Sequence, residues 1–366
     1  MSPGESEPRA SLWIPKTSAG AAIRLLVRAQ LLDNRSRFIE VGQTLVVPLA
    51  REPTSQEIGA LEESVGTVVL GKDHFEPKSR NVFSLQEVLE HELPPELMAS
   101  LPASLDIIGD IALIELAQEL APYEEILARG ILKVNRNVRV VLAKAGTVSG
   151  FERIRPIRYL AGEHRTQTVH RESGCRFKID MSKAYFSPRL SHEHQRVTVQ
   201  VEPGEVVIDM FAGVGPFAVM IAKKLDDVEV NAVDANPDAV SLIRDNVKLN
   251  KIRGKLNIWP GDATEVVETH LTGIASRVIM NHPSAAKTFV GVACRGLRRQ
   301  GGLIHYYTFA EGVHCEQGAL TEFQDALQGC GWKVKELGEV RRVRGVSPMR
   351  WQVVVDAKVA PAMAIS

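Results

Sequence analysis

The sequence has little that would favour a secreted, membrane-spanning or fibrous protein. Its four cysteines are scattered and form no Cys-x-x-Cys pair, so neither a disulfide framework nor zinc-finger spacing is expected. We therefore expect reduced thiols, no bound metal and a cytoplasmic location. No apolar run approaches the about 20 residues that a membrane-spanning helix needs. Lysine plus arginine and aspartate plus glutamate number 44 each, so any nucleic-acid surface must be local.

The chain of 366 residues is long enough for two or three domains. Residues 72–104 are polar and contain prolines, as linkers often are. We expect the following organisation: a disordered tail over 1–10, a small α+β domain over 11–71, a linker over 72–104, a middle α+β domain over 105–204, a Rossmann-like α/β domain over 205–359 and a tail over 360–366.

A strand, a glycine turn and a helix follow one another in the second half of the chain. Residues 206–209 predict a buried strand, Gly213 and Gly215 the turn, and residues 217–224 the helix. Glycines let the backbone approach a ligand closely because they carry no Cβ. The next strand ends at Asp234, at the spacing where a carboxylate meets the hydroxyls of a ribose. The ligand should therefore be an adenosine-type nucleoside cofactor.

Two cofactors compete for this turn. Gly213, Gly215 and Ala218 also fit the dinucleotide pattern G-x-G-x-x-G/A, so a nicotinamide enzyme is an alternative. Against it, Asp209 directly precedes the turn, where it would repel a pyrophosphate but could hold an ammonium group such as that of methionine. Asp262 closes the third strand and could face an adenine amino group. Acids at three successive strand ends favour S-adenosylmethionine.

The competing interpretation of these three acids is that they cap helices and form turns, as aspartate usually does at strand ends. We include in the predicted cofactor site the residues that follow two of the acids, Ala235 and Ala263. A fourth strand over residues 277–280 ends in a segment suited to holding a planar, amide-like substrate, Asn281-His282-Pro283. A final hairpin over residues 332–355 follows five strand–helix units, which is typical of methyltransferase sheets and disfavours the nicotinamide enzyme.

The densest basic segment lies in the middle domain and interleaves arginines with rings. On a strand, alternate arginines would share one face and could contact phosphates. The alternative is an exposed strand face with solvated charges. The residues concerned are Arg153, Arg155, Arg158, Tyr159, His164, Arg165, His170 and Arg171.

Several separate motifs together resemble the archaeal and eukaryotic tRNA (guanine-N1)-methyltransferases. They agree with that family in order and spacing over roughly residues 11–359. The motifs are residues 159–163 (Tyr-Leu-Ala-Gly-Glu), 185–190 (Tyr-Phe-Ser-Pro-Arg-Leu), 209–217 (Asp-Met-Phe-Ala-Gly-Val-Gly-Pro-Phe), 279–283 (Ile-Met-Asn-x-Pro) and 305–307 (His-Tyr-Tyr). The resemblance implies methyl transfer to guanosine at tRNA position 37 and a mobile N-terminal domain that contacts the tRNA.

The resemblance also implies roles for individual residues. Glu193 matches the general base, Arg153 matches the arginine that steadies the guanine, and Asn281 and Pro283 match the motif that lines the pocket. By itself Glu193 reads as a solvated glutamate at a helix start. Asp234 and Asp262 match the ribose and adenine contacts.

Two further residues belong to the predicted site, and two positions depart from the family pattern. His194 is included as a cofactor contact and Arg189 as a substrate contact. His194 stands where the family would have Arg, and His282 stands where relatives usually have Pro or Leu.

Other activities remain open from the sequence. The nearest is the related wyosine-pathway enzyme, which transfers the aminocarboxypropyl group of the same cofactor to the same tRNA position. A bifunctional enzyme that also methylates a wyosine intermediate, and a non-catalytic tRNA-binding protein, are further alternatives. We expect tRNA as the partner and a monomer.

Overall fold

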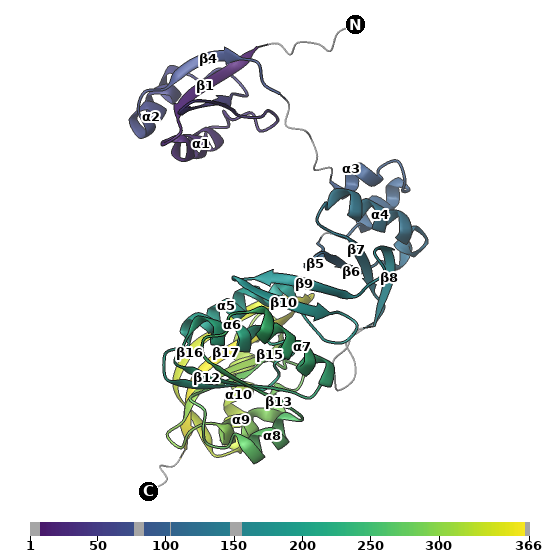
Figure 1. Ribbon diagram of the computed structural model, residues 1–366, viewed down its shortest axis with the longest axis vertical. Helices are drawn as coiled ribbons and strands as arrows, with labels where there is room; N and C mark the ends of the chain where they lie inside the picture. The colour runs from purple at the N-terminus through teal and green to yellow at the C-terminus, as the bar shows by residue number, and fades with distance from the viewer. Residues whose placement is uncertain (1–7, 77–83, 103, 147–155, 363–366) are drawn as a thin grey trace. The chain divides into compact units, whose positions relative to one another are not determined.

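The computed structural model describes residues 8–76, 84–102, 104–146 and 156–362. The chain divides into two compact units, Met1–Ser84 and Leu85–Ser366 (Figure 1). Among the described residues, no helix is both long and apolar enough to cross a membrane.

The first unit is a four-stranded antiparallel sheet covered by two helices, with strand order β2-β3-β1-β4. Alternation places Leu12 and Ile14 on the buried face of β1, where they join Leu26 of α1 in the core. Because β1 begins at Arg9, the expected disordered tail over 1–10 is too long. The elements are β1 (Arg9–Pro15), α1 (Ala19–Arg28), β2 (Ile39–Val41), β3 (Thr44–Pro48), α2 (Ser55–Val65) and β4 (Val69–Asp73).

The second unit begins with a small domain whose sheet has the order β5-β6-β7-β8. Its strand β6 is apolar throughout and buried on both faces: one face packs under α4 and its neighbours, and the other packs in a cluster with residues 175–179. The elements are α3 (Leu85–Leu89), the 3₁₀ turn η1 (Pro95–Ser100), β5 (Asp106–Ile108), β6 (Ile111–Ile114), η2 (Gln118–Tyr123), α4 (Glu124–Val134), β7 (Val140–Lys144) and β8 (Ile157–Gly162).

Part of the expected linker is folded. We expected a linker over 72–104, but residues 85–100 form α3 and η1 and belong to the core of the second unit. Leu89 is fully buried against α4, and Gly130 of α4 makes room for it: a Cβ there would lie 2.8 Å from Leu89 Cδ2. The apolar residues Leu85, Val88 and Leu89 recur at helical spacing, which outweighs the polar composition around them.

A two-stranded ribbon and a helix connect this domain to the large sheet: β9 (Gln167–Glu172), β10 (Cys175–Asp180), η3 (Pro188–Leu190) and α5 (Ser191–Gln200). Two asparagines of the next domain satisfy the free backbone edge of β10. Asn246 pairs with the N–H and C=O of Lys178 at 2.6 and 3.2 Å, and Asn250 pairs with those of Arg176 at 3.0 and 2.8 Å. The predicted border at residue 204 therefore does not separate two independently packed bodies.

The large sheet confirms the predicted fold class, a C-terminal Rossmann-like methyltransferase sheet. Its seven strands have the order β13-β12-β11-β14-β15-β17-β16, and only the pairs made by β17 are antiparallel. The elements are β11 (Glu205–Asp209), α6 (Pro216–Lys224), β12 (Val228–Asp234), α7 (Pro237–Leu249), β13 (Lys255–Pro260), α8 (Ala263–His270), β14 (Arg277–Met280), η4 (Ala286–Phe289), α9 (Val290–Gly296), β15 (Gly302–Glu311), α10 (Cys315–Gly329), β16 (Trp332–Ser347) and β17 (Arg350–Pro361).

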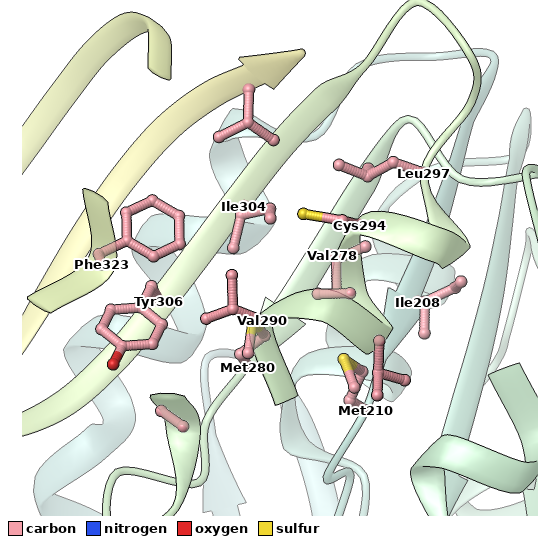
Figure 2. Close-up of a cluster of buried hydrophobic side chains, with 14 of the residues drawn as sticks. Ile208, Met210, Val278, Met280, Val290, Cys294, Leu297, Ile304, Tyr306 and Phe323 are labelled. Atoms are coloured by element: carbon pink, nitrogen blue, oxygen red, sulfur yellow. The ribbon is translucent and has the colours of Figure 1, made fainter. Parts of the chain in front are cut away.

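Helices cover both faces of this sheet. On one face α8, α9 and α10 bury a cluster that includes Ile208, Val278, Ile304, Tyr306 and Phe323 (Figure 2). On the other face, α5, α6 and α7 pack over the alternate residues of the same strands. This second face and the carboxyl ends of the parallel strands hold the predicted site residues.

Candidate active site

The turn after β11 has the backbone conformation for which glycine is suited. Gly213 and Gly215 have φ angles of +56° and +86°, in the left-handed region. Gly215 is the N-cap of α6, and a Cβ added to it would lie 3.2 Å from Val219 Cγ2 and 3.4 Å from Ile243 Cγ1. The turn thus leaves the backbone at a helix N-terminus free of side chains, as nucleotide-binding turns require.

Asp209, the last residue of β11, is completely buried. Burial and the nearby carboxylate of Asp234 raise its pKa to about 7, and the backbone amides of Phe211 and Ala218 offset this only in part. Neither side-chain oxygen has a hydrogen bond of good geometry among the described residues. A buried carboxylate with no cationic partner is costly, so this position is suited to a cationic ligand group such as an ammonium.

Asp234 ends the neighbouring strand β12 and is tied to the glycine turn. Its Oδ2 accepts a hydrogen bond from the Gly213 amide at 2.6 Å, and its Oδ1 accepts one from the Asn236 amide at 2.9 Å. Burial raises the pKa of Asp234, while these two amides lower it. Each oxygen keeps a second lone pair, so the carboxylate can still accept hydrogen bonds from two hydroxyls.

The third acid, Asp262, follows β13 and is the N-cap of α8. Its Oδ1 accepts a hydrogen bond from the Thr264 amide at 2.8 Å, which is the capping role that we considered as the alternative. Capping occupies one oxygen and leaves the other for a ligand. Because β13, β12 and β11 are neighbours in a parallel sheet, the three acids lie along one edge, as predicted.

Ala235 and Ala263 directly follow two of these acids. Ala263 is buried at the start of α8, and Ala235 is partly buried between β12 and α7. Each side chain is a single methyl group, so it adds little bulk beside Asp234 or Asp262.

Asn281 follows β14 and is the first residue of a hydrogen-bond chain that leads to the β16–β17 hairpin. Its Oδ1 accepts from Gln352 Nε2 at 3.1 Å, and Gln352 Oε1 accepts from Arg344 Nε at 2.8 Å. Arg344 in turn donates to Ser187 Oγ and to the Tyr185 hydroxyl, both at 2.9 Å. Two motifs far apart in sequence, residues 185–190 and 281–283, are thus held by one arginine and one glutamine.

The rest of the Asn-x-Pro segment packs on aromatic rings. Pro283 is buried. The ring of His282, the departure from the family pattern, lies 4.8 Å from that of Phe211 and 6.2 Å from that of Phe289, measured between ring centroids. The imidazole of His282 therefore packs against two aromatic rings.

Glu193 lies in the first turn of α5 and is buried, with 1 % of its surface exposed. Its Oε2 accepts from the Tyr307 hydroxyl at 2.8 Å and from Arg196 Nη2 at 3.0 Å. The guanidinium of Arg341 forms an ion pair with its Oε1. The interpretation of Glu193 as a solvated glutamate is therefore wrong.

His194, next along α5, is fully buried on the same helix. Its Nδ1 forms a hydrogen bond of 2.7 Å with Glu172 Oε1, and its ring lies edge-to-face on Phe217 at 4.7 Å. Its Nε2 has no partner among the described residues, so this atom is the one that a ligand would contact.

The remaining predictions concern basic residues. Arg153 lies outside the described residues, as does Arg155. Arg189 donates to Asp106 Oδ1 at 2.6 Å and lines a cavity of about 430 Å³ together with Tyr185 and Lys144. This volume is in the range of small-molecule sites.

Among the described residues, the expected row of phosphate-contacting arginines gains little support. Arg158 forms an ion pair with Glu124, and Arg165 pairs with Asp110 at 2.6 Å and with Glu163 at 2.8 Å. Both arginines are thus neutralised by carboxylates of their own domain.

Sequence reasoning missed the residues that surround Glu193 and Asn281: Arg196, Tyr307, Arg341, Arg344, Gln352 and Asp356. One signal was available. Gln352 and Asp356 flank three valines, and their spacing of four residues places both polar side chains on the same face of a strand.

Two family models match the chain. A TRM5/TYW2 methyltransferase domain matches residues 168–335, and a TYW2 N-terminal domain matches residues 85–166.

Among similar proteins, the tRNA (guanine(37)-N(1))-methyltransferase Trm5b of Pyrococcus abyssi is 35% identical, over 95% of this chain and 98% of the relative. The protein of that name from Methanocaldococcus jannaschii is 31% identical over the same shares. The tRNA(Phe) (4-demethylwyosine(37)-C(7)) aminocarboxypropyltransferase of Pyrococcus horikoshii is 30% identical, over 75% of this chain and 96% of the relative.

Solved structures agree. The crystal structure of Pyrococcus abyssi Trm5b superposes with a TM-score of 0.72 at 33% identity, covering 96% of this chain and 99% of that one. The complex of aTrm5 with tRNALeu gives 0.65 at 29% identity, covering 95% and 99%. P. horikoshii TYW2 in complex with MeSAdo gives 0.63 at 28% identity, covering 76% and 98%.

Proposed function

Because the chain belongs to the TRM5/TYW2 methyltransferase family, we propose that it transfers a methyl group from S-adenosylmethionine to N1 of guanosine at tRNA position 37. This nucleoside lies 3′ of the anticodon. The proposal makes the chain an S-adenosylmethionine-dependent tRNA (guanine-N1)-methyltransferase with tRNA as its partner.

One observation carries the choice of reaction within the family. Relatives named as guanine-N1 methyltransferases match 95% of this chain. The aminocarboxypropyltransferase matches only 75% of this chain, although the match includes 96% of the aminocarboxypropyltransferase itself. Both family models begin at or after residue 85, so the first unit, residues 1–84, accounts for the difference. The possession of this unit therefore supports methyl transfer to N1.

The edge of the sheet described above fits the cofactor. We assign Asp234 to the ribose hydroxyls, because each of its oxygens keeps a lone pair, and Asp209 to the ammonium of the methionine part, because it is buried beside another acid. Asp262 would face the adenine amino group. When bound, the cofactor supplies a methyl group that is already activated by a positively charged sulfur. The other residues that we assign to cofactor binding are His194, Gly213, Gly215, Ala235, Ala263 and Asn281.

Glu193 is our candidate for the general base. Guanine N1 carries a proton at neutral pH and is a poor nucleophile until that proton leaves. Removal of the proton by a positioned carboxylate typically contributes roughly 10²–10⁴-fold to the rate. Since Oε2 already accepts from Tyr307 and Arg196, Oε1 is the atom to take the proton, once the guanine replaces Arg341 there.

The developing charge on the base needs a cation. As N1 loses its proton, negative charge builds on guanine O6, and the guanidinium of Arg153 is assigned to hold it. Asn281 presents an amide that can pair with a base edge, and its orientation is fixed by Gln352. Pro283 and Arg189 are assigned to the wall of the substrate pocket.

The test uses two unmodified tRNA transcripts that differ only in guanosine or adenosine 3′ of the anticodon. The protein is incubated with each transcript and with methyl-labelled S-adenosylmethionine, and the RNA is digested to nucleosides. We expect labelled 1-methylguanosine from the first transcript alone. Absence of label from both transcripts, with cofactor binding intact, would contradict the proposal.

A second candidate has one observation in its favour: the model that matches residues 85–166 is named for the TYW2 N-terminal domain. An aminocarboxypropyl transferase would move a different carbon of the same cofactor to a wyosine intermediate at position 37. Cofactor labelled in the carboxypropyl group separates the two, because only this second reaction transfers that label to tRNA. A bifunctional enzyme would instead methylate both guanosine and the wyosine intermediate.

We further propose that the protein acts as a monomer in the cytoplasm. The described cysteines are all free, which suits a reducing compartment. Light scattering of the purified protein tests the oligomeric state, with a mass near the 40.2 kDa of one chain expected.

A further inference from the structure

Arg196 bridges two buried carboxylates, which lie on two adjacent edges of its guanidinium that share Nη2. Its Nε and Nη2 donate to Glu193 Oε2 at 3.2 and 3.0 Å. Its Nη1 forms an ion pair with Asp356 Oδ2, and Nη2 also reaches Asp356 Oδ1 at 3.4 Å. Glu339 lies 3.5 Å from Nη1 at the solvent side. Asp356 and Glu339 can therefore hold Arg196 in place from the side of its guanidinium that is away from Glu193.

Asp356 is itself fixed by His305, the residue opposite it on β15. His305 Nδ1 lies 2.6 Å from Asp356 Oδ1, and His305 Nε2 lies 2.9 Å from Arg277 Nη1. Arginine can only donate, so Nε2 accepts and the proton of the neutral ring is on Nδ1, where it is donated to Asp356. Burial lowers the pKa of His305, which agrees with a neutral ring.

Arg277 completes the network at the far end. It makes two hydrogen bonds of 2.7 Å to Glu205. The carboxylate of Glu205 therefore balances the positive charge of the guanidinium that faces His305. Burial raises the pKa of Asp356, but His305 and Arg196 outweigh burial and hold it at about 2. Asp356 is therefore ionised at neutral pH.

We propose that Asp356 is a positioning residue for Glu193, which it orients and keeps basic by holding and neutralising Arg196. This inference rests on the proposed function, since it concerns the base for guanine N1. Three groups donate to or pair with Glu193: Arg196 from its own helix, Tyr307 from β15 and Arg341 from β16. Two uncompensated guanidiniums would make the carboxylate a weak base. The charge of Asp356 removes most of that effect for Arg196.

The structure offers a matched control on the opposite face of β15. Glu322 of α10 accepts hydrogen bonds from the Tyr306 hydroxyl at 2.5 Å and from Thr308 Oγ1 at 2.9 Å. It is a carboxylate hydrogen-bonded to the same strand, but its partners Tyr306 and Thr308 alternate with Tyr307, the partner of Glu193, and so lie on the opposite face of β15. E322Q therefore removes the charge of a carboxylate that is hydrogen-bonded to β15, as D356N does, but leaves the hydrogen bonds of Asp356 unchanged.

The experiment measures single-turnover methyl transfer to guanosine-37 tRNA together with the Kd values for cofactor and for tRNA. We expect D356N to lower the rate by roughly 10- to 100-fold, because small misplacements of a reacting group cost about that much. Both Kd values should stay within about twofold of wild type, and E322Q should keep the wild-type rate. An unchanged rate in D356N overturns the inference, whereas absence of methylation by the wild type overturns the proposed function as well.

A double-mutant comparison distinguishes positioning from a general loss of structure. In an E193Q background, D356N should lower the residual rate no further, because both changes act through the same carboxylate. An additional loss equal to that in wild type would overturn the inference. R196K serves if D356N does not fold: an ammonium cannot hold both carboxylates, so the same selective loss of rate is expected, and a wild-type rate would count against the inference.

Discussion

At the scale of single residues, the two buried carboxylates Glu193 and Asp209 lie in opposite electrostatic surroundings. Glu193 faces two guanidiniums and a hydroxyl, so its ionised form has partners. Asp209 faces another acid and has no hydrogen bond of good geometry among the described residues. The surroundings of Glu193 suit a side chain that stays in position during a reaction. Those of Asp209 suit a side chain that binds a cationic ligand group.

The role of Glu193 is checked by replacing it with glutamine, which keeps the shape and removes the basic oxygen. We expect E193Q to lower single-turnover methyl transfer by roughly 10²–10⁴-fold, while the Kd for S-adenosylmethionine changes by less than about twofold. Stopped reactions and isothermal titration calorimetry give the two values. E202Q, at an exposed glutamate just after α5, is the control. A wild-type rate in E193Q would remove Glu193 as the base.

The raised pKa of Asp209 predicts how stability depends on pH. Its pKa is about 7 in the folded protein and near 3.8 when unfolded, so the folded state binds more protons between these values. Stability should therefore fall as pH rises from about 4 to 7, by on the order of a few kcal/mol from this group. Urea unfolding of the cofactor-free protein should show that the free energy of unfolding of D209N, relative to that of wild type, is larger at pH 8 than at pH 5. An equal difference at both pH values would contradict the assignment.

The sequence predicted the three aspartates of the cofactor edge because each directly follows a recognisable strand. It did not predict the burial of Glu193. The segment Ser191–Gln200 is polar, and such helices normally lie at the surface. Its burial depends on Arg341 of β16 and Tyr307 of β15, which are more than 100 residues away along the chain. Only the tertiary fold brings those compensating charges to the helix.

At the scale of elements, the β16–β17 hairpin does more than complete the edge of the large sheet, because it also supplies side chains to the site. Residues 332–347 form one continuous strand with several register shifts, so the first strand of the predicted hairpin extends past Arg341, Arg342 and Arg344. The strand is hard to recognise in the sequence because charged residues occupy adjacent positions, as at Lys335 and Glu336 and at Arg341 and Arg342, and so break the two-residue period. The hairpin carries Arg344, Gln352 and Asp356 into contact with three other parts of the site.

The contribution of this hairpin can be measured with R344A, which removes the hydrogen bonds to Tyr185, Ser187 and Gln352. We expect a roughly tenfold loss in kcat/KM for tRNA, because the loop over residues 185–190 and Asn281 lose a common support, with little change in cofactor affinity. R350A is the matched control: it lies on the same hairpin, where it stacks on Phe309. Equal effects of both variants would mean that the hairpin acts only through its general stability.

At the scale of the whole molecule, each of the two units has its own apolar core. The pattern of strands and helices predicted a small α+β domain over 11–71, and the elements β1 to β4 with α1 and α2 lie within residues 9–73. The border was less predictable, because a polar stretch with prolines resembles a linker whether or not a few of its leucines are buried.

Removal of residues 1–84 tests the division of labour between the units. The remaining chain keeps the complete large sheet and the domain before it, so we expect folding and cofactor binding to persist. Binding of tRNA should weaken by at least tenfold, measured by filter binding, if the first unit is a recognition domain. Undiminished activity on full-length tRNA would show that it is not.

The position of β17 between β15 and β16 has a consequence for the order in which the protein becomes active during synthesis. A nascent chain that has left the ribosome as far as Ser347 already contains the glycine turn and the three aspartates of the cofactor edge. It lacks Gln352 and Asp356, and its β15 is an unpaired edge. The ability to bind cofactor should therefore precede the ability to catalyse, and newly made chains that stall before β17 would be prone to aggregate.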